Sequence, residues 1–293
     1  MNYSKWQHPG THREHIVCDE SERSYLVHVP NQKMPAAGWA LVFAFHGSGS
    51  SGEDMADFSG LISKAEAASF VVVFPDGSGR IPSARTWNAG HCCGYAHRHQ
   101  VDDVKFVTMM LDALTEELNI DSTRIFATGM SNGAMLCYLL ADELSDRFAA
   151  IAAVAGTMGA ATCSPTRAIP ILHFHGTDDE FVLCDGGHGR RSISRADFYS
   201  VSHTLHHWVQ ANRANVTPET TRLNGPVDDG TWIEKSCYRK IEDNSADVIL
   251  YTIHNGGHTW PGHENNYPFL GKVTQNLDAN DVIWDFFQAN PMP

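Results

Sequence analysis

The pentapeptide Gly129-Met130-Ser131-Asn132-Gly133 is the segment whose residue types and spacing point most directly to chemistry. It lies between a run typical of a strand, residues 124–128, and a helical pattern that begins at Asn132. A serine on such a sharp strand-to-helix turn presents its hydroxyl at the edge of a sheet, and the flanking glycines relieve the crowding of the turn. We therefore predict that Ser131 is a nucleophile, and not part of an ordinary glycine-rich turn.

A serine nucleophile needs a general base, and the base needs a carboxylate that orients it. In folds with this turn, the acid and then the histidine follow the serine along the chain. His258 comes just past the last strand run, on a loop restrained by glycines and a Pro-Gly pair, so it is the candidate base. His254 and His263 are its rivals among the 17 histidines.

The candidate acid and the candidate oxyanion donors lie on two other loops that follow strand runs. Asp178 and Asp179 are adjacent, and their chemistry alone does not decide which of them orients the histidine. A developing oxyanion needs N–H donors. One donor is the N–H of Asn132, directly after the nucleophile. The other is expected in the glycine-rich loop 46–52, and we assign it to the N–H of Ser48.

The elements that must position these groups alternate between short apolar runs and helical patterns, which is typical of an α/β fold. We predict a mainly parallel, doubly wound sheet with helices on both faces. The strand runs are 24–29 (an antiparallel edge strand), 40–45, 70–74, 124–128, 149–155, 169–174 and 248–253, and the helices are 101–118, 132–144 and 281–287. The long loops 75–100, 176–198 and 254–275 follow strand carboxyl ends, where open α/β sheets bind ligands. One domain is expected over 1–293, with residues 1–20 as an N-terminal extension.

The composition excludes several classes of protein. A chain of 293 residues, 42% of them hydrophobic and 10% aromatic, can bury a large core and is not disordered. Lys and Arg number 21 against 34 Asp and Glu, and the net charge of −13 argues against nucleic acid or an anionic membrane as partner. No apolar run approaches the ~20 residues of a spanning helix. The N-terminus lacks the apolar segment of a secretory signal, so a cytoplasmic location is the alternative to a chain whose signal has been removed. We expect no obligatory protein partner.

An ordered set of motifs resembles one known family. The set comprises Phe45-His46-Gly47, Phe74-Pro75-Asp76-Gly77, Trp87-Asn88-Ala89-Gly90-x-Cys92-Cys93, Val101-Asp102-Asp103-Val104, the segment Gly129 to Gly133, His175-Gly176-Thr177-x-Asp179-x-x-Val182 and Gly257-His258-Thr259-Trp260-Pro261-Gly262. It spans residues 40–287 and is similar to the polyhydroxybutyrate depolymerase and feruloyl esterase family (carbohydrate esterase family 1, esterase D-like α/β-hydrolases).

The resemblance implies an α/β-hydrolase fold and a serine hydrolase without cofactor or metal. Its substrates would be feruloylated or acetylated xylan, or polyhydroxyalkanoate, and its members are extracellular or periplasmic. The His-Gly-Thr-x-Asp motif of the family falls on Asp179, which assigns the acid. His46, Trp87 and Trp260 are then candidates for substrate contacts, because indole faces can stack on a cinnamoyl ring or lie along a polyester chain. The alternative, that both indoles only pack loops together, stands beside it.

Acidic residues and cysteines that follow Trp87 in the sequence could have structural, metal-binding or disulfide roles. Asp102 and Asp103 open a helix, where negative charge is favourable, and we expect both to be structural. The segment 91–99 holds Cys and His, but adjacent cysteines rarely bind one zinc ion, so we expect no metal. If the loops after Trp87 and Asp179 line one cleft, Cys184 can pair with Cys92 or Cys93; otherwise all seven thiols are free.

The function expected from the sequence is that of a serine carboxylesterase that forms an acyl-enzyme. Ser131 attacks the ester, His258 transfers the proton, and Asp179 orients the imidazole. Feruloyl or acetyl esters of plant cell-wall xylan are the expected substrates, with polyhydroxyalkanoate as the alternative and acyl transfer to an alcohol as the nearest rival reaction. A carbohydrate-binding protein on an inactive hydrolase scaffold is the alternative from another class, and it has no need of all three residues.

Overall fold

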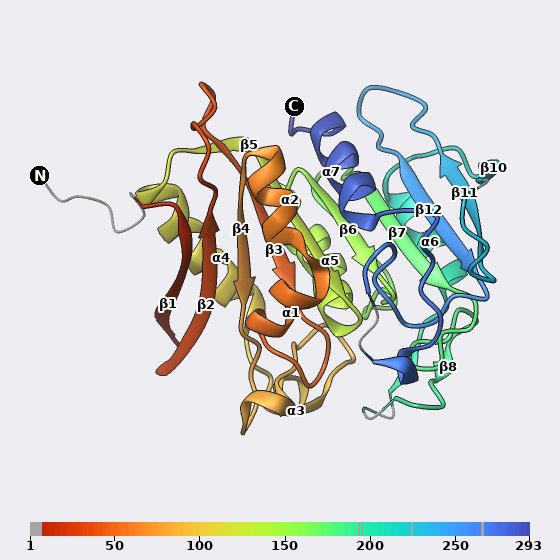
Figure 1. Ribbon diagram of the computed structural model, residues 1–293, viewed down its shortest axis with the longest axis horizontal. Coiled ribbons are helices and arrows are strands. Elements are labelled where there is room, and N and C mark those ends of the chain that lie inside the picture. Colours follow the sequence, from red (N-terminus) through yellow and green to blue (C-terminus); the bar gives the residue numbers. More distant parts are fainter. Residues whose placement is uncertain (1–7, 193, 195, 224, 265–266) are drawn as a thin grey trace, which may run out of the picture.

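A mixed sheet of ten strands organises the chain (Figure 1). The computed structural model describes residues 8–192, 194, 196–223, 225–264 and 267–293. The strands of this sheet are β1 (Gly10–Cys18), β2 (Ser21–Val29), β3 (Trp39–Phe45), β4 (Phe70–Pro75), β5 (Ile120–Met130), β6 (Ala150–Val154), β7 (Ile171–Gly176), β10 (Glu219–Leu223), β11 (Trp232–Tyr238) and β12 (Val248–His254). Their order is β1-β2-β4-β3-β5-β6-β7-β12-β11-β10.

The centre of the sheet is parallel and its two margins are antiparallel. Strands β4, β3, β5, β6, β7 and β12 run in one direction. Strands β3, β4, β6 and β7 are buried along their whole length, as strands covered on both faces should be. The mainly parallel sheet predicted from the sequence is therefore confirmed, and so are its six central strands, with ends that differ by a few residues.

Helices cover both faces of the sheet (Figure 1). Helices α1 (Gly52–Ser59), α2 (Leu61–Ala68) and α7 (Ala279–Ala289) enclose one apolar core, and α4 (Asp103–Glu117), α5 (Asn132–Glu143) and α6 (Val201–Ala211) enclose the other. The short helix α3 (Gly94–Arg98) lies in the loop after β4. This arrangement confirms the doubly wound architecture. None of the helices in the described residues is long and apolar enough to cross a membrane.

The margins of the sheet differ from the sequence prediction. Residues 10–18, which were expected in an N-terminal extension, form β1 and pair with β2. The run 24–29 was expected at an edge, but β2 lies between β1 and β4. Strands β1 and β10 alternate or remain exposed, and β10 is Glu-Thr-Thr-Arg-Leu, so neither has the apolar run that marks a buried strand.

The long loops at the carboxyl ends of β4, β7 and β12 meet at one edge of the sheet, as predicted. They carry the 3₁₀ turns η1 (Pro82–Ala84) and η2 (Pro268–Leu270), helix α3, and a small hairpin of β8 (Gly187–His188) and β9 (Asp197–Phe198). In Figure 1, α3 and β8 lie at this lower edge. Every candidate catalytic residue lies at this edge or in these loops.

Candidate active site

Ser131 occupies a strained turn between β5 and α5. Its backbone has φ 56° and ψ −119°, a conformation that costs a non-glycine residue on the order of 1–3 kcal/mol. The Ser131 N–H donates to the Val154 carbonyl oxygen of β6 at 2.8 Å, which holds the turn against the next strand. A Cβ on Gly129 or Gly133 would collide with the Phe45 carbonyl oxygen, so both positions must lack a side chain. This is the geometry expected of a nucleophile turn.

Asn132 opens α5 and fixes the loop that carries Trp87. Its side-chain oxygen accepts the Trp87 N–H at 2.7 Å, and its side-chain nitrogen donates to the Trp87 carbonyl oxygen at 3.1 Å. Both ends of the amide side chain are therefore engaged within the protein. The backbone N–H of Asn132 has no intrahelical acceptor, because the first N–H groups of a helix never do. It lies at the positive end of the helix dipole.

The loop that carries Ser48 passes beside Ser131. A Cβ on Gly47 would lie 3.4 Å from the Ser131 Cβ. Ser48 is exposed, and its backbone N–H makes no hydrogen bond to another described residue. Buried Asp76 holds the loop, because its carboxylate accepts the Gly52 N–H at 2.9 Å. The N–H groups of Ser48 and Asn132 thus donate to no other described residue.

Asp179 and His258 form a buried hydrogen-bonded pair. The Nδ1–H of His258 donates to one carboxylate oxygen of Asp179 at 2.7 Å, and the two side chains are almost inaccessible. The other oxygen accepts the N–H groups of Phe181 and Val182 at 2.8 and 2.9 Å. Burial alone would raise the pKa of the Asp179 carboxyl, but His258 and the Val182 N–H hold that pKa below its ordinary value. The carboxylate is therefore ionised beside the imidazole.

The rival acid and bases lie elsewhere. Asp178 is exposed, and the Thr177 hydroxyl donates to it at 3.2 Å. The ring of His254 stacks on Trp232 with centroids 3.5 Å apart. His263 lies 2.9 Å from the amide nitrogen of Asn280. The structure brings Asp179 and His258 together and leaves the rivals outside this pair.

Ser131 lies at the carboxyl end of β5, while Asp179 and His258 follow β7 and β12 at the same edge. The order β5-β6-β7-β12 places the three loops along one stretch of the sheet. The Ser131 hydroxyl makes no hydrogen bond with another described residue, so the hydrogen bond joins Asp179 to His258 and does not extend to Ser131. In unliganded hydrolases that bond is often long and tightens only with substrate.

A series of buried, hydrogen-bonded side chains lies beside Asp179, and it was not predicted from the sequence. The Tyr138 hydroxyl lies 2.7 Å from His173 Nδ1, and His173 Nε2 lies 3.1 Å from His175 Nδ1. His175 Nε2 then lies 2.8 Å from the Val182 carbonyl oxygen. Burial lowers the pKa of both histidines, so each is neutral and carries one N–H. If each group donates to the next, from the Tyr138 hydroxyl to the Val182 carbonyl oxygen, every nitrogen and oxygen in this series has a hydrogen-bond partner.

The three side chains expected to contact substrate are buried, so this expectation is wrong. His46 is 0% exposed, and its Nε2 accepts the Gly77 N–H at 2.9 Å. Burial lowers the pKa of His46 to about 4, so it stays neutral. Trp87 donates its indole N–H to the His46 carbonyl oxygen at 2.9 Å, and Trp260 donates to Asn280 at 3.0 Å. The alternative, that the indoles pack loops together, is what the structure shows.

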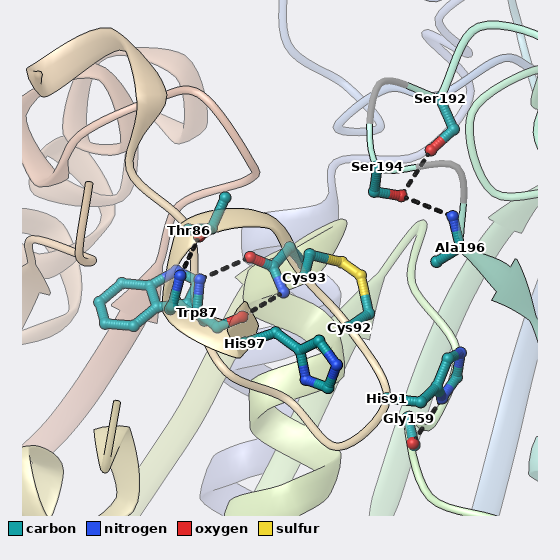
Figure 2. The surroundings of a disulfide bond; sticks show 12 residues. Thr86, Trp87, His91, Cys92, Cys93, His97, Gly159, Ser192, Ser194 and Ala196 are labelled. Carbon is teal, nitrogen blue, oxygen red and sulfur yellow. Dashed lines mark hydrogen bonds between the residues drawn. A yellow bond between two sulfur atoms is a disulfide. The ribbon is translucent and has the colours of Figure 1, made fainter. Parts of the chain in front are cut away.

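The cysteine pairing expected from the sequence is also wrong. Cys92 and Cys93 form a disulfide with each other, which leaves no sulfur for Cys184. Figure 2 shows this bond on the loop that also carries Trp87 and His91. Cys184 is a half-buried free thiol. The remaining alternative of seven free thiols fails as well. Among the described residues, no group of three or more His, Cys, Asp or Glu could hold a metal ion.

The two acidic residues that open α4 have separate tasks. Asp102 caps the helix, because its side chain accepts the Lys105 N–H at 2.8 Å. Asp103 is buried, pairs with Arg23 at 2.8 Å and accepts the Asn88 N–H at 2.8 Å. The structural role expected for both is thus what the contacts show, and Asp103 additionally anchors the loop next to Trp87. Only Asp102 has the N-cap role that an acidic residue at a helix start predicts.

Three comparisons with known proteins bear on this site. The model of the family described as esterase PHB depolymerase matches residues 24–240. The protein named "Putative esterase NocK" of Nocardia uniformis subsp. tsuyamanensis is 29% identical over 94% of this chain and 82% of its own length. Feruloyl esterase B of Piromyces equi is 29% identical over 64% of this chain, which spans only 33% of that protein. An acetyl xylan esterase structure from Aspergillus awamori has a TM-score of 0.61 at 16% identity, covering 85% of this chain and 94% of that one, and this likeness shows the α/β-hydrolase fold.

Proposed function

Because the chain belongs to the esterase PHB depolymerase family and is a carboxylic ester hydrolase, we propose that it works as a serine esterase through an acyl-enzyme. The observation that carries the proposal is the buried Asp179–His258 bond of 2.7 Å, at the same sheet edge as the strained turn of Ser131. A structural ion pair would have no need of a nucleophile turn beside it.

In the proposed reaction, His258 Nε2 takes the proton of the Ser131 hydroxyl as the oxygen attacks the ester carbonyl carbon. Asp179 holds the Nδ1–H, which leaves Nε2 free to accept a proton, and it stabilises the imidazolium that forms. The N–H groups of Ser48 and Asn132 bind the oxyanion. His258 then gives its proton to the leaving alcohol oxygen, and water activated by the same imidazole releases the acid from Ser131.

We propose feruloyl or acetyl esters of xylan as the substrates. Two of the compared proteins, named feruloyl esterase B and acetyl xylan esterase, support this choice by their names. The family description supports a polyester of hydroxybutyrate as the second candidate. An extracellular or periplasmic location is part of the proposal, and the Cys92–Cys93 disulfide supports it because such bonds persist in oxidising compartments.

The test is turnover of methyl ferulate, acetylated xylan and polyhydroxybutyrate side by side, by the wild type and by Ser131→Ala. We expect release of ferulate or acetate by the wild type and a loss on the order of 10⁴-fold in the variant. Adding a sugar acceptor separates hydrolysis from acyl transfer, since transfer makes a new ester instead of free acid. Preferential turnover of the polyester would replace the substrate class, and an active Ser131→Ala would refute the mechanism.

A further inference from the structure

An aromatic surface continues directly from the ring of His258. Phe181 stacks on that ring, with centroids 5.0 Å apart and planes 28° apart. Phe269 follows Phe181 at 6.3 Å, and Tyr267 follows Phe269 at 5.8 Å. Phe269 is 53% exposed and Tyr267 is 49% exposed. Of the described large apolar side chains that are strongly exposed, these two are the aromatic ones.

The backbone fixes these rings relative to the Asp179–His258 pair. The Phe181 N–H donates to Asp179, so the backbone that carries this ring is held by Asp179. The His258 N–H donates to the Leu270 carbonyl oxygen at 2.7 Å, which ties the turn η2 to the histidine. Phe269 lies within that turn. Two separate loops, one after β7 and one after β12, therefore bring their aromatic rings to the same side of the imidazole.

The position of the rings indicates which half of an ester they face. In the proposed mechanism, His258 must hand its proton to the leaving alcohol oxygen, so the alcohol lies against the imidazole. Rings that continue from the imidazole therefore extend along the alcohol, whereas the acyl carbon is held at Ser131 and the oxyanion donors. This step rests on the proposed function.

The surroundings of the rings favour an alcohol that is apolar on one face and polar at its edge. An exposed ion pair, Arg191 with Glu180 at 2.6 Å, lies directly beside Phe181 along the chain. Phe269 and Tyr267 are open to water, which does not suit a long alkyl chain that needs an enclosed channel. A sugar ring has an apolar C–H face that packs on an aromatic ring and hydroxyl groups that remain hydrated.

We propose that Phe181, Tyr267 and Phe269 form an alcohol-side subsite that stacks on the sugar ring carrying the ester. Each exposed ring then contributes to recognition of the sugar and not to the acyl step. The subsite makes the enzyme prefer an ester of a sugar over an ester of methanol with the same acid.

The experiment compares two esters of one acid, the acyl group that the wild type hydrolyses fastest: its methyl ester and its ester on a xylo-oligosaccharide. The quantity measured is the ratio of kcat/KM for the sugar ester to kcat/KM for the methyl ester. We expect Phe269→Ala and Tyr267→Ala each to lower this ratio about five- to tenfold, mainly through KM for the sugar ester. Phe269→Tyr keeps a ring and should keep the ratio.

Ile241→Ala is the matched control, since Ile241 is 68% exposed and lies before β12, at the amino end of the strand. Its ratio should equal that of the wild type. Unchanged ratios in Phe269→Ala and Tyr267→Ala, or equal losses on both esters, would overturn the subsite and leave the proposed function standing. A wild type that hydrolyses no ester of any acid tested, so that no acyl group can be chosen, would overturn both.

Discussion

Replacing Asp179 by Asn tests the acid without removing its shape. One oxygen of Asp179 accepts two backbone N–H groups, at 2.8 and 2.9 Å. The introduced amide must keep its oxygen on those two donors, so its NH₂ group faces His258 Nδ1 across the former 2.7 Å bond. His258 Nδ1 then has to accept a hydrogen bond from this NH₂ group. The proton of the neutral imidazole therefore moves from Nδ1 to Nε2. A protonated Nε2 cannot take the proton of Ser131.

The expected loss in kcat is about 10⁴-fold, which corresponds to about 5.4 kcal/mol of transition-state stabilisation at ~1.36 kcal/mol per decade. Asp178→Asn is the control, because Asp178 is exposed and its carboxylate accepts a hydrogen bond only from the Thr177 hydroxyl among the described residues. We expect it to retain kcat within twofold. The assay is steady-state hydrolysis of methyl ferulate or of p-nitrophenyl acetate, with melting temperature measured for each variant. Equal losses in the two folded variants would refute the assignment of the acid.

Three further predictions concern the buried groups around the site. Burial lowers the pKa of His46 to about 4 from 6.5, so the stability that neutral His46 contributes is complete above pH 6.5 and is lost as the pH falls toward 4. Over that range, urea unfolding should show the free energy of unfolding of the wild type falling by about 3 kcal/mol more than that of His46→Gln. Arg23→Met strands the buried carboxylate of Asp103 and should lower the free energy of unfolding by about 3–5 kcal/mol, whereas an unchanged urea midpoint would contradict a buried ion pair. Peptide mapping without reductant should recover Cys184 alkylated and Cys92–Cys93 oxidised; a Cys184 crosslink would contradict the structure.

The central sheet could be predicted because the signal for each of its strands lies in consecutive residues. Strands such as β3 and β4 are continuous apolar runs, and only a strand covered on both faces tolerates such a run. The serine turn was readable for the same reason, since its two glycines and its flanking elements are adjacent in the chain. Strand β1 and strand β10 carry no such signal, because their side chains alternate or remain exposed and pairing alone makes them strands.

The partners of side chains were harder to predict than their loops. Trp87 and Trp260 lie on the expected loops, but their burial depends on acceptors from distant segments, a carbonyl oxygen at His46 and the amide of Asn280. The aromatic surface around Phe269 was missed for a similar reason. Its rings come from loops about 90 residues apart, and only the assembled sheet edge brings them together.

Covalent labelling of Ser131 tests whether this residue is the nucleophile. The wild type is treated with phenylmethylsulfonyl fluoride, digested and mapped by mass spectrometry while the remaining esterase activity is followed. We predict one sulfonyl adduct per chain, on the peptide that contains Ser131, formed in step with the loss of activity and much more slowly in Asp179→Asn. Complete modification of Ser131 with full activity retained, or inactivation by an adduct on another residue, would contradict the account.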